Sequence, residues 1–205
     1  SIGIVLILSV FVGAVATILV AYNIDSPLIP EKMVGFTARQ MIILEFSPTI
    51  ISLILAGKLG SQIASEIGSM RVTQQIDALQ VMGINTANYL ILPKIIASLL
   101  FIPVLIIFSI VIGILGGWLA CIVANVITPT NYVIGLRAWF EPFSVTFAMI
   151  KTVVFAFLIS SISSYIGYSV KGGSVEVGKA STQAVVISSI AIIIFDLILT
   201  QMLLT

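Results

Sequence analysis

Five long stretches of apolar residues dominate this sequence and limit what it can fold into. The hydrocarbon core of a bilayer takes about 20 apolar residues in helical form. In lipid each segment must satisfy its own backbone hydrogen bonds, which favours helices, and no stretch shows the period-2 alternation of a barrel strand. We therefore predict an all-α, polytopic membrane protein with one domain over residues 1–205 and spans at about residues 2–22, 37–64, 90–127, 143–170 and 180–204.

The scarcity of charge supports this prediction. Charged residues make up 8% of the chain and hydrophobic residues 60%, whereas an ordinary soluble domain carries about 25% charged residues. The first stretch lacks the basic leader and small-residue cleavage site of a secretory signal, so we interpret it as a span. The net charge of +1 gives no indication of a nucleic-acid partner.

Catalytic and metal-binding groups are also scarce. The chain has no histidine, which is the commonest general base and metal ligand, and its single cysteine, Cys121, lies in an apolar run. We therefore predict neither a catalytic site nor a metal site.

The basic residues of the loops do not orient the chain. An excess of Lys and Arg normally marks the cytoplasmic side. Here the loops after spans one and three contain or flank nearly as many basic residues as the loops after spans two and four. The first group is Lys32, Arg39, Arg137 and Lys151, and the second is Arg71, Lys94, Lys171 and Lys179, with Lys58 a little deeper in its span.

The connector between spans two and three reads GSMRVTQQIDALQVMG over residues 68–83. Apolar residues recur at helical spacing on one side, with polar residues on the other faces, which predicts a short amphipathic helix. One interpretation is an interfacial helix lying on the lipid headgroups. The other is a docking helix that enters a groove on a soluble partner and transmits its movement.

Near the C-terminal end, GGSVEVGKAST (residues 172–182) resembles a phosphate-binding loop. Such a loop needs a preceding strand and a Ser or Thr directly after the lysine. Here Ala180 follows Lys179, and a membrane span precedes the glycines. We interpret the segment as a turn between spans four and five, so that any ATP hydrolysis requires a separate subunit.

Several strings of mixed residues along most of the chain resemble the MlaE family of permeases. These strings are EFSP (45–48), LAGK (55–58), EIGSMRVTQQIDAL (66–79), LPK (92–94), GILGG (113–117), IKTVVF (150–155), GKAST (178–182) and FDLILT (195–200). Members of the family are membrane subunits of ABC transporters that move phospholipids between the inner and outer membranes of Gram-negative bacteria. The resemblance implies the same function here, in the maintenance of outer-membrane lipid asymmetry, with multi-pass insertion in the inner membrane.

The resemblance also implies partners and an orientation. By this resemblance, residues 68–83 correspond to the cytoplasmic coupling helix that contacts an ATPase similar to MlaF. That partner would hold the ATP and magnesium. A homodimer, a periplasmic MCE-domain protein similar to MlaD, and a small STAS-type accessory subunit complete the expected assembly. The expected ATPase-coupling residues are Glu66, Met70, Arg71, Thr73, Gln75, Asp77 and Leu79. The segment around Trp139 and Phe140 would then face the periplasm.

Some charged residues fall well inside predicted spans, where a charge is costly and usually marks function or a pair. Lys151 and Asp196 lie at similar depth on spans four and five and are expected to pair, either to hold the bundle or as part of a mechanism. Glu45 shows no evident partner on its own helix. We expect it to face a central cavity, near the lipid headgroup.

Acyl chains need only an apolar cavity that excludes water. Spans one, two and five would line it, although each candidate residue also suits helix packing. The candidates beside Glu45 are Leu44, Phe46, Ile50, Leu53 and Leu199.

Two other classes of function stay open at this stage. A stand-alone secondary transporter or channel would use Glu45, Lys151 and Asp196 as an ion relay, but such proteins favour inverted repeats, and none is visible here. An intramembrane enzyme would need catalytic groups that the sequence does not offer.

Overall fold

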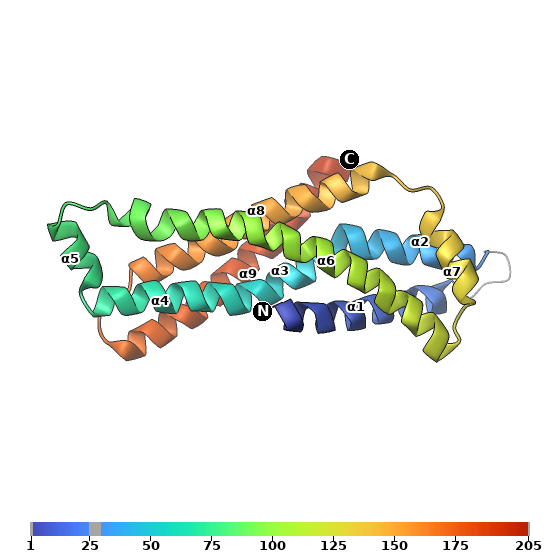
Figure 1. The fold of residues 1–205 in the computed structure, drawn as a ribbon, viewed down its shortest axis with the longest axis horizontal. Coiled ribbons are helices and arrows are strands. Elements are labelled where there is room, and N and C mark those ends of the chain that lie inside the picture. The colour runs from blue at the N-terminus through green and yellow to red at the C-terminus, as the bar shows by residue number, and fades with distance from the viewer. Residues whose placement is uncertain (1, 25–29, 205) are drawn as a thin grey trace. The chain divides into compact units, whose positions relative to one another are not determined.

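A computed structural model of the chain describes residues 2–24 and 30–204, which fold as helices joined by short connectors (Figure 1). Five helical stretches of this part are long and apolar enough to cross a membrane. The all-α polytopic prediction is therefore confirmed. The stretches are Ile2–Asn23, Lys32–Val72, Ala87–Ala124, Pro142–Tyr168 and Ser174–Leu203, so the second extends beyond its predicted limits of 37–64 at both ends.

The contacts of the chain divide it into two compact units. Unit 1 comprises Ser1–Ile51 and Val104–Ile150, and unit 2 comprises Ser52–Pro103 and Lys151–Thr205. One boundary falls at Pro103, inside the continuous helix α6 (Leu92–Ala124). Proline removes a backbone hydrogen bond from a helix interior, so this boundary coincides with a local weakness of α6.

Unit 1 is held by close backbone approaches at glycines. It contains α1 (Ile2–Asn23), α2 (Lys32–Met41), the C-terminal part of α6, and α7 (Pro129–Arg137). A Cβ added at Gly13 would overlap the backbone of Gly113, and one added at Gly35 would overlap the backbone of Tyr132. Small residues thus let α1 pack on α6 and α2 pack on α7.

Tyr132 lies at the centre of this packing and is fully buried. Its hydroxyl donates to the Ile114 carbonyl at 3.3 Å. Burial raises the pKa of Tyr132 to about 12, so the hydroxyl remains a protonated donor at physiological pH.

Unit 2 contains α4 (Ser61–Val72), α5 (Gln75–Val81), the C-terminal part of α8 (Pro142–Tyr168), and α9 (Ser174–Leu204). Helices α4 and α9 lie side by side (Figure 1). A Cβ on Gly167 of α8 would overlap the backbone of Ala64, and the space beside Gly68 is filled by Val170 and Val177. Small residues at four-residue spacing on α4 therefore face α8 and α9.

Three segments form π-helices rather than α-helices: η1 (Ile42–Ile50), η2 (Ala56–Gly60) and η3 (Ala87–Ile91). The first surrounds Pro48 and continues into α3 (Ile51–Leu55). Proline cannot donate to the helical ladder and its ring collides with the preceding turn, so a locally widened helix accommodates it. The span is therefore continuous through Pro48.

Candidate coupling hairpin and membrane charges

The connector between the second and third spans is a hairpin, which we define as residues 73–86. The structure differs here from the single helix predicted over 68–83. Residues 68–72 end α4, Gln74 takes a left-handed conformation with φ +59°, and α5 begins at Gln75. A left-handed residue cannot continue an α-helix, so the chain turns at this point.

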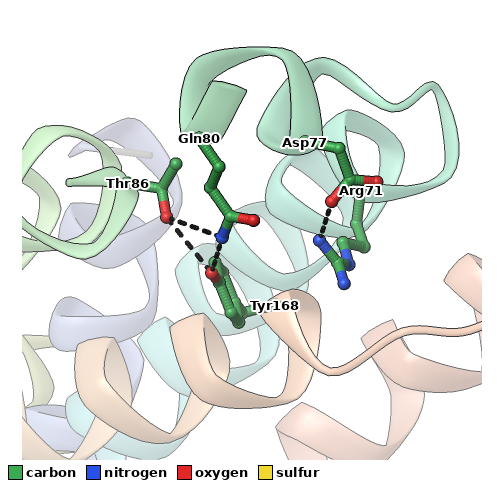
Figure 2. Close-up of polar contacts among 5 residues, drawn as sticks. All are labelled: Arg71, Asp77, Gln80, Thr86 and Tyr168. Carbon is green, nitrogen blue, oxygen red and sulfur yellow. Dashed lines mark hydrogen bonds and ion pairs between the residues drawn. The ribbon is translucent and has the colours of Figure 1, made fainter. Parts of the chain in front are cut away.

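An ion pair closes the base of the hairpin on one side. Arg71 Nη1 lies 2.5 Å from Asp77 Oδ1, and both side chains are partly exposed (Figure 2). The Arg71 guanidinium also lies over the ring of Tyr168, 5.7 Å from its centroid. Two predicted coupling residues thus contact each other, and one of them, Arg71, also contacts the last residue of α8.

The hydroxyl of Tyr168 joins the other side of the hairpin to α8. It accepts a hydrogen bond from Gln80 Nε2 at 2.8 Å and lies 3.1 Å from Thr86 Oγ1 (Figure 2). Gln80 Nε2 and Thr86 Oγ1 are themselves 3.5 Å apart. These three groups come from α5, from the residue before η3 and from α8, so one small network anchors the hairpin to a membrane helix.

The far end of the hairpin exposes apolar side chains. Val81 is 88% exposed and Met82 is 65% exposed. Asp77 lies on the same short helix, whose one buried residue is Ile76. The hairpin therefore presents apolar and charged groups together, as protein-docking surfaces do.

The other predicted coupling residues have different surroundings. Glu66 lies on α4, where its Oε2 is 2.7 Å from Lys94 Nζ of α6. Thr73 is exposed and donates to the Ser69 carbonyl at 2.8 Å. Gln75 is exposed, whereas Met70 and Leu79 are half-buried.

The segment that resembles a phosphate-binding loop is helical. Helix α9 begins at Ser174, so Gly178 and Lys179 lie within it rather than in a loop. Lys179 Nζ is 2.7 Å from Glu176 Oε1, one turn earlier on the same helix. Two open cavities border this region, and the larger, of about 430 Å³, is bounded by Arg71, Tyr168, Ser169, Val170 and Lys171.

Inside the membrane helices of unit 2, the structure brings together the two residues expected to pair. Lys151 Nζ on α8 lies 2.8 Å from Asp196 Oδ1 on α9. The Lys151 side chain is fully buried and that of Asp196 is 18% exposed. A buried charge is stable only when it is paired and hydrogen-bonded, so this contact links α8 to α9.

Glu45 has a contact that the sequence did not indicate. It lies half-buried in η1, and Thr49 Oγ1 donates to Glu45 Oε2 at 3.4 Å. The expectation that Glu45 lacks a partner on its own helix is therefore wrong, because Thr49 stands about one turn later. The other candidates for the lipid cavity are also half-buried: Leu44, Phe46 and Ile50 in η1, Leu53 in α3 and Leu199 in α9.

Sequence reasoning missed Gln80, Thr86 and Tyr168. Gln80 and Tyr168 are separated by 88 positions in the chain. The only available signal was an aromatic residue at the end of an apolar span, a position typical of the membrane interface. That signal does not reveal which residue the phenol contacts.

Comparison with known proteins gives a consistent answer over almost the whole chain. The family described as Permease MlaE matches residues 1–202. A probable ABC transporter permease protein of Rickettsia bellii is 36% identical over 202 residues, which cover 98% of this chain and 78% of the relative. A probable ABC transporter permease protein of Synechocystis is 33% identical and covers 98% of this chain and 76% of the relative.

A plant protein is also similar. The chloroplastic protein TRIGALACTOSYLDIACYLGLYCEROL 1 of Arabidopsis thaliana is 34% identical over 201 residues, which cover 98% of this chain and 57% of the relative. The family match and the relative from Rickettsia bellii agree with the resemblance found in the sequence. The chain therefore belongs to the MlaE permease family.

Proposed function

We propose that this chain is the membrane subunit of an ABC transporter that moves phospholipids between the inner and outer membranes of a bacterium. A separate ATPase similar to MlaF, holding ATP and magnesium, drives it by binding the 73–86 hairpin. Support comes from the family, from the relatives named as ABC transporter permeases, and from the plant relative, whose name is that of a glycolipid.

The observation that carries the proposal is the construction of the hairpin. Gln80 and Thr86 tie it to α8 through Tyr168, and the two residues directly after Gln80, Val81 and Met82, are exposed. A helix of seven residues that buries one side chain has little stability of its own. Such an element, attached to α8 through side chains and exposing apolar residues beside them, suits a groove on a partner that moves.

The assembly proposed around this chain is a homodimer with two ATPase subunits in the bacterial inner membrane. A periplasmic MCE-domain protein similar to MlaD and a small STAS-type subunit are further proposed partners. The lipid cavity would be lined by apolar residues near Glu45. A Glu45→Gln variant that purifies with as much phospholipid as wild type would count against a role for Glu45 in that cavity.

Docking is tested by co-expression and co-purification of the chain with an ATPase similar to MlaF. The double variant Val81→Asp/Met82→Asp removes the exposed apolar end. Burial of each such side chain contributes about 1.5–3 kcal/mol, and about 1.4 kcal/mol is a tenfold change in affinity. We expect the retained ATPase to fall at least tenfold. Val175→Asp is the matched control, since Val175 is 71% exposed near the start of α9, and it should retain the ATPase.

The transported class is tested separately by reconstituting the complex in vesicles and following labelled phospholipid. Transfer that needs ATP and stops with the hairpin variant supports the proposal. Transport driven by an ion gradient without any ATPase would instead establish the secondary-transporter alternative. A mass spectrum of the intact complex reports its subunits and bound lipid.

A further inference from the structure

One side chain in the last turn of α8 contacts several residues of the hairpin and of the adjoining end of α4. The hydroxyl of Tyr168 contacts Gln80 and Thr86, and the face of its ring lies beneath Arg71 (Figure 2). These three partners belong to three parts of the chain around the hairpin: the end of α4, the end of α5 and the residue before η3. Tyr168 is therefore the point at which both arms of the hairpin meet α8.

The geometry of the phenol explains why it can hold both arms. A phenol has one O–H donor and can also accept. When Gln80 Nε2 donates to the oxygen at 2.8 Å, the phenol's own proton remains for Thr86 Oγ1 at 3.1 Å. Thr86 is 4% exposed, so this bond is shielded from water. Phenylalanine would preserve the ring under Arg71 and lose both hydrogen bonds.

The other polar link of the hairpin that the structure describes leads to α4 rather than to α8. Ile76 is the one buried residue of α5. The Arg71–Asp77 ion pair joins α5 to the end of α4, and it involves α8 only where the Arg71 guanidinium lies over the ring of Tyr168. The position of the hairpin relative to α8 therefore depends strongly on Tyr168.

Helix α8 leads from Tyr168 directly to the buried charge pair. It is continuous from Pro142 to Tyr168, and its Lys151 contacts Asp196 of α9. A displacement of the last turn of α8 is thus carried by an unbroken helix towards the membrane interior. Rigid elements of this kind transmit a displacement only when the point of attachment does not slip.

We propose that Tyr168 is a positioning residue that makes the hairpin and α8 move as one body, so that motion of a docked ATPase reaches the membrane helices. This inference rests on the proposed function, in which the ATPase binds the hairpin. Tyr168 acts through Gln80 and Thr86 and does not itself contact nucleotide or lipid in this proposal.

The test is Tyr168→Phe in the reconstituted complex, with lipid transferred per ATP hydrolysed as the readout. We expect the ATPase to remain bound and to hydrolyse ATP, while the ratio of lipid transferred to ATP falls at least threefold. A purely structural role would change the melting temperature and the yield but not this ratio. Tyr165→Phe is the matched control, because Tyr165 lies one turn earlier on α8 and is 72% exposed.

A second variant keeps the test decisive if Tyr168→Phe folds poorly. Thr86→Val removes the other hydroxyl and preserves the side-chain shape. Both variants break the same bond, so the double variant should lower the ratio no further than the stronger single variant. Additive losses, or a wild-type ratio in Tyr168→Phe, would overturn the inference.

A reversible cross-link tests the same inference by restoring the connection between the hairpin and α8 instead of removing it. In a Cys121→Ser background, Gln80→Cys and Tyr168→Cys are joined by a short bifunctional thiosulfonate. If the hairpin and α8 move together, the cross-link restores the ratio that the two substitutions lowered, and a reducing agent removes the gain. A cross-link that stops transfer would show that the two elements must separate. An ATPase that does not bind the wild-type chain at all would instead overturn the proposed function, and this inference with it.

Discussion

Two connectors between membrane helices, α7 with its following residues in unit 1 and the 73–86 hairpin in unit 2, are held by contrasting contacts. In the first, Arg39 is 3% exposed and donates to the carbonyls of Leu136, Ala138 and Trp139 at 2.5, 3.0 and 3.2 Å. In the second, exposed or half-exposed side chains and the buried hydroxyl of Thr86 contact one another around Tyr168. The first connector is bound to α2 through its backbone, and the second is bound to α8 only through side chains.

Glycines extend this contrast. A Cβ added at Gly135 of α7 would overlap the Lys32 carbonyl of α2, whereas a Cβ at Gly83 of the hairpin would meet nothing within 4 Å. Dense backbone packing resists displacement, and a short helix attached by side chains yields to it. We infer that the α7 connector is a fixed part of its unit and that the hairpin is the part a partner can displace.

The comparison requires that the stability of unit 2 reside in its membrane helices and not in the hairpin. Lys151→Met removes the buried partner of Asp196 and should cost about 3–5 kcal/mol, because it leaves a carboxylate with its main counter-charge gone. Thermal unfolding in detergent measures the loss. The double variant Lys151→Met/Asp196→Leu should recover most of it. Equal losses in the single and double variants would show that the pair is not what links α8 to α9.

A smaller but still large loss is expected at the α7 connector itself. Arg39→Met leaves three backbone carbonyls without their donor, and hydrogen bonds to a charged group contribute about 1.5–3 kcal/mol each. Because the three bonds share one guanidinium, their contributions do not add, and we expect a loss of about 3 kcal/mol, together with protease cleavage near Trp139. Arg137→Met is the control, because Arg137 is exposed at the end of the same helix. Cleavage that is equally slow in both variants would mean that Arg39 does not hold this connector.

Backbone packing is tested at Gly135. Gly135→Ala forces α7 away from α2, and overpacking of this kind costs about 1–3 kcal/mol. Gly178→Ala is the control, because Gly178 lies inside α9 with nothing within 4 Å of an added Cβ. Alanine is the better helix former, so the control should be neutral or slightly stabilised. A melting temperature unchanged by Gly135→Ala would remove the contrast between the two connectors.

The sequence predicted the broad layout because each of its signals is local. Apolar length is enough to place five spans, and counting along two helices from the turn between them places Lys151 beside Asp196 in depth. The polar connector was visible for the same reason, since its composition differs from that of the spans on either side.

The details that shape the candidate site depend on contacts distant in sequence or on backbone choices with weak signals. Nothing in the composition near Gln74 requires a left-handed turn, which divides the predicted helix in two. Pro48 predicted a bend, and the widened helix η1 absorbs it instead. The role of Arg39 emerges only when α7 folds back onto α2, because its three acceptors are backbone carbonyls that any sequence would provide.

The smallest effect on stability is expected at the ion pair that joins α5 of the hairpin to the end of α4. Arg71 and Asp77 are 32% and 51% exposed, and pairs of this kind contribute about 0.2–1 kcal/mol. Arg71→Asp or Asp77→Arg alone should therefore change the melting temperature little, but each should weaken ATPase retention.

The charge-swapped double variant decides between two causes of this weaker retention. If the pair acts by shaping the hairpin, the swap restores retention. If either side chain contacts the ATPase directly, the swap retains as little ATPase as the single variants, because the partner then meets the wrong charge at both positions. In either case, loss of binding without loss of stability is what separates the hairpin from the α7 connector, where Arg39→Met should affect stability first.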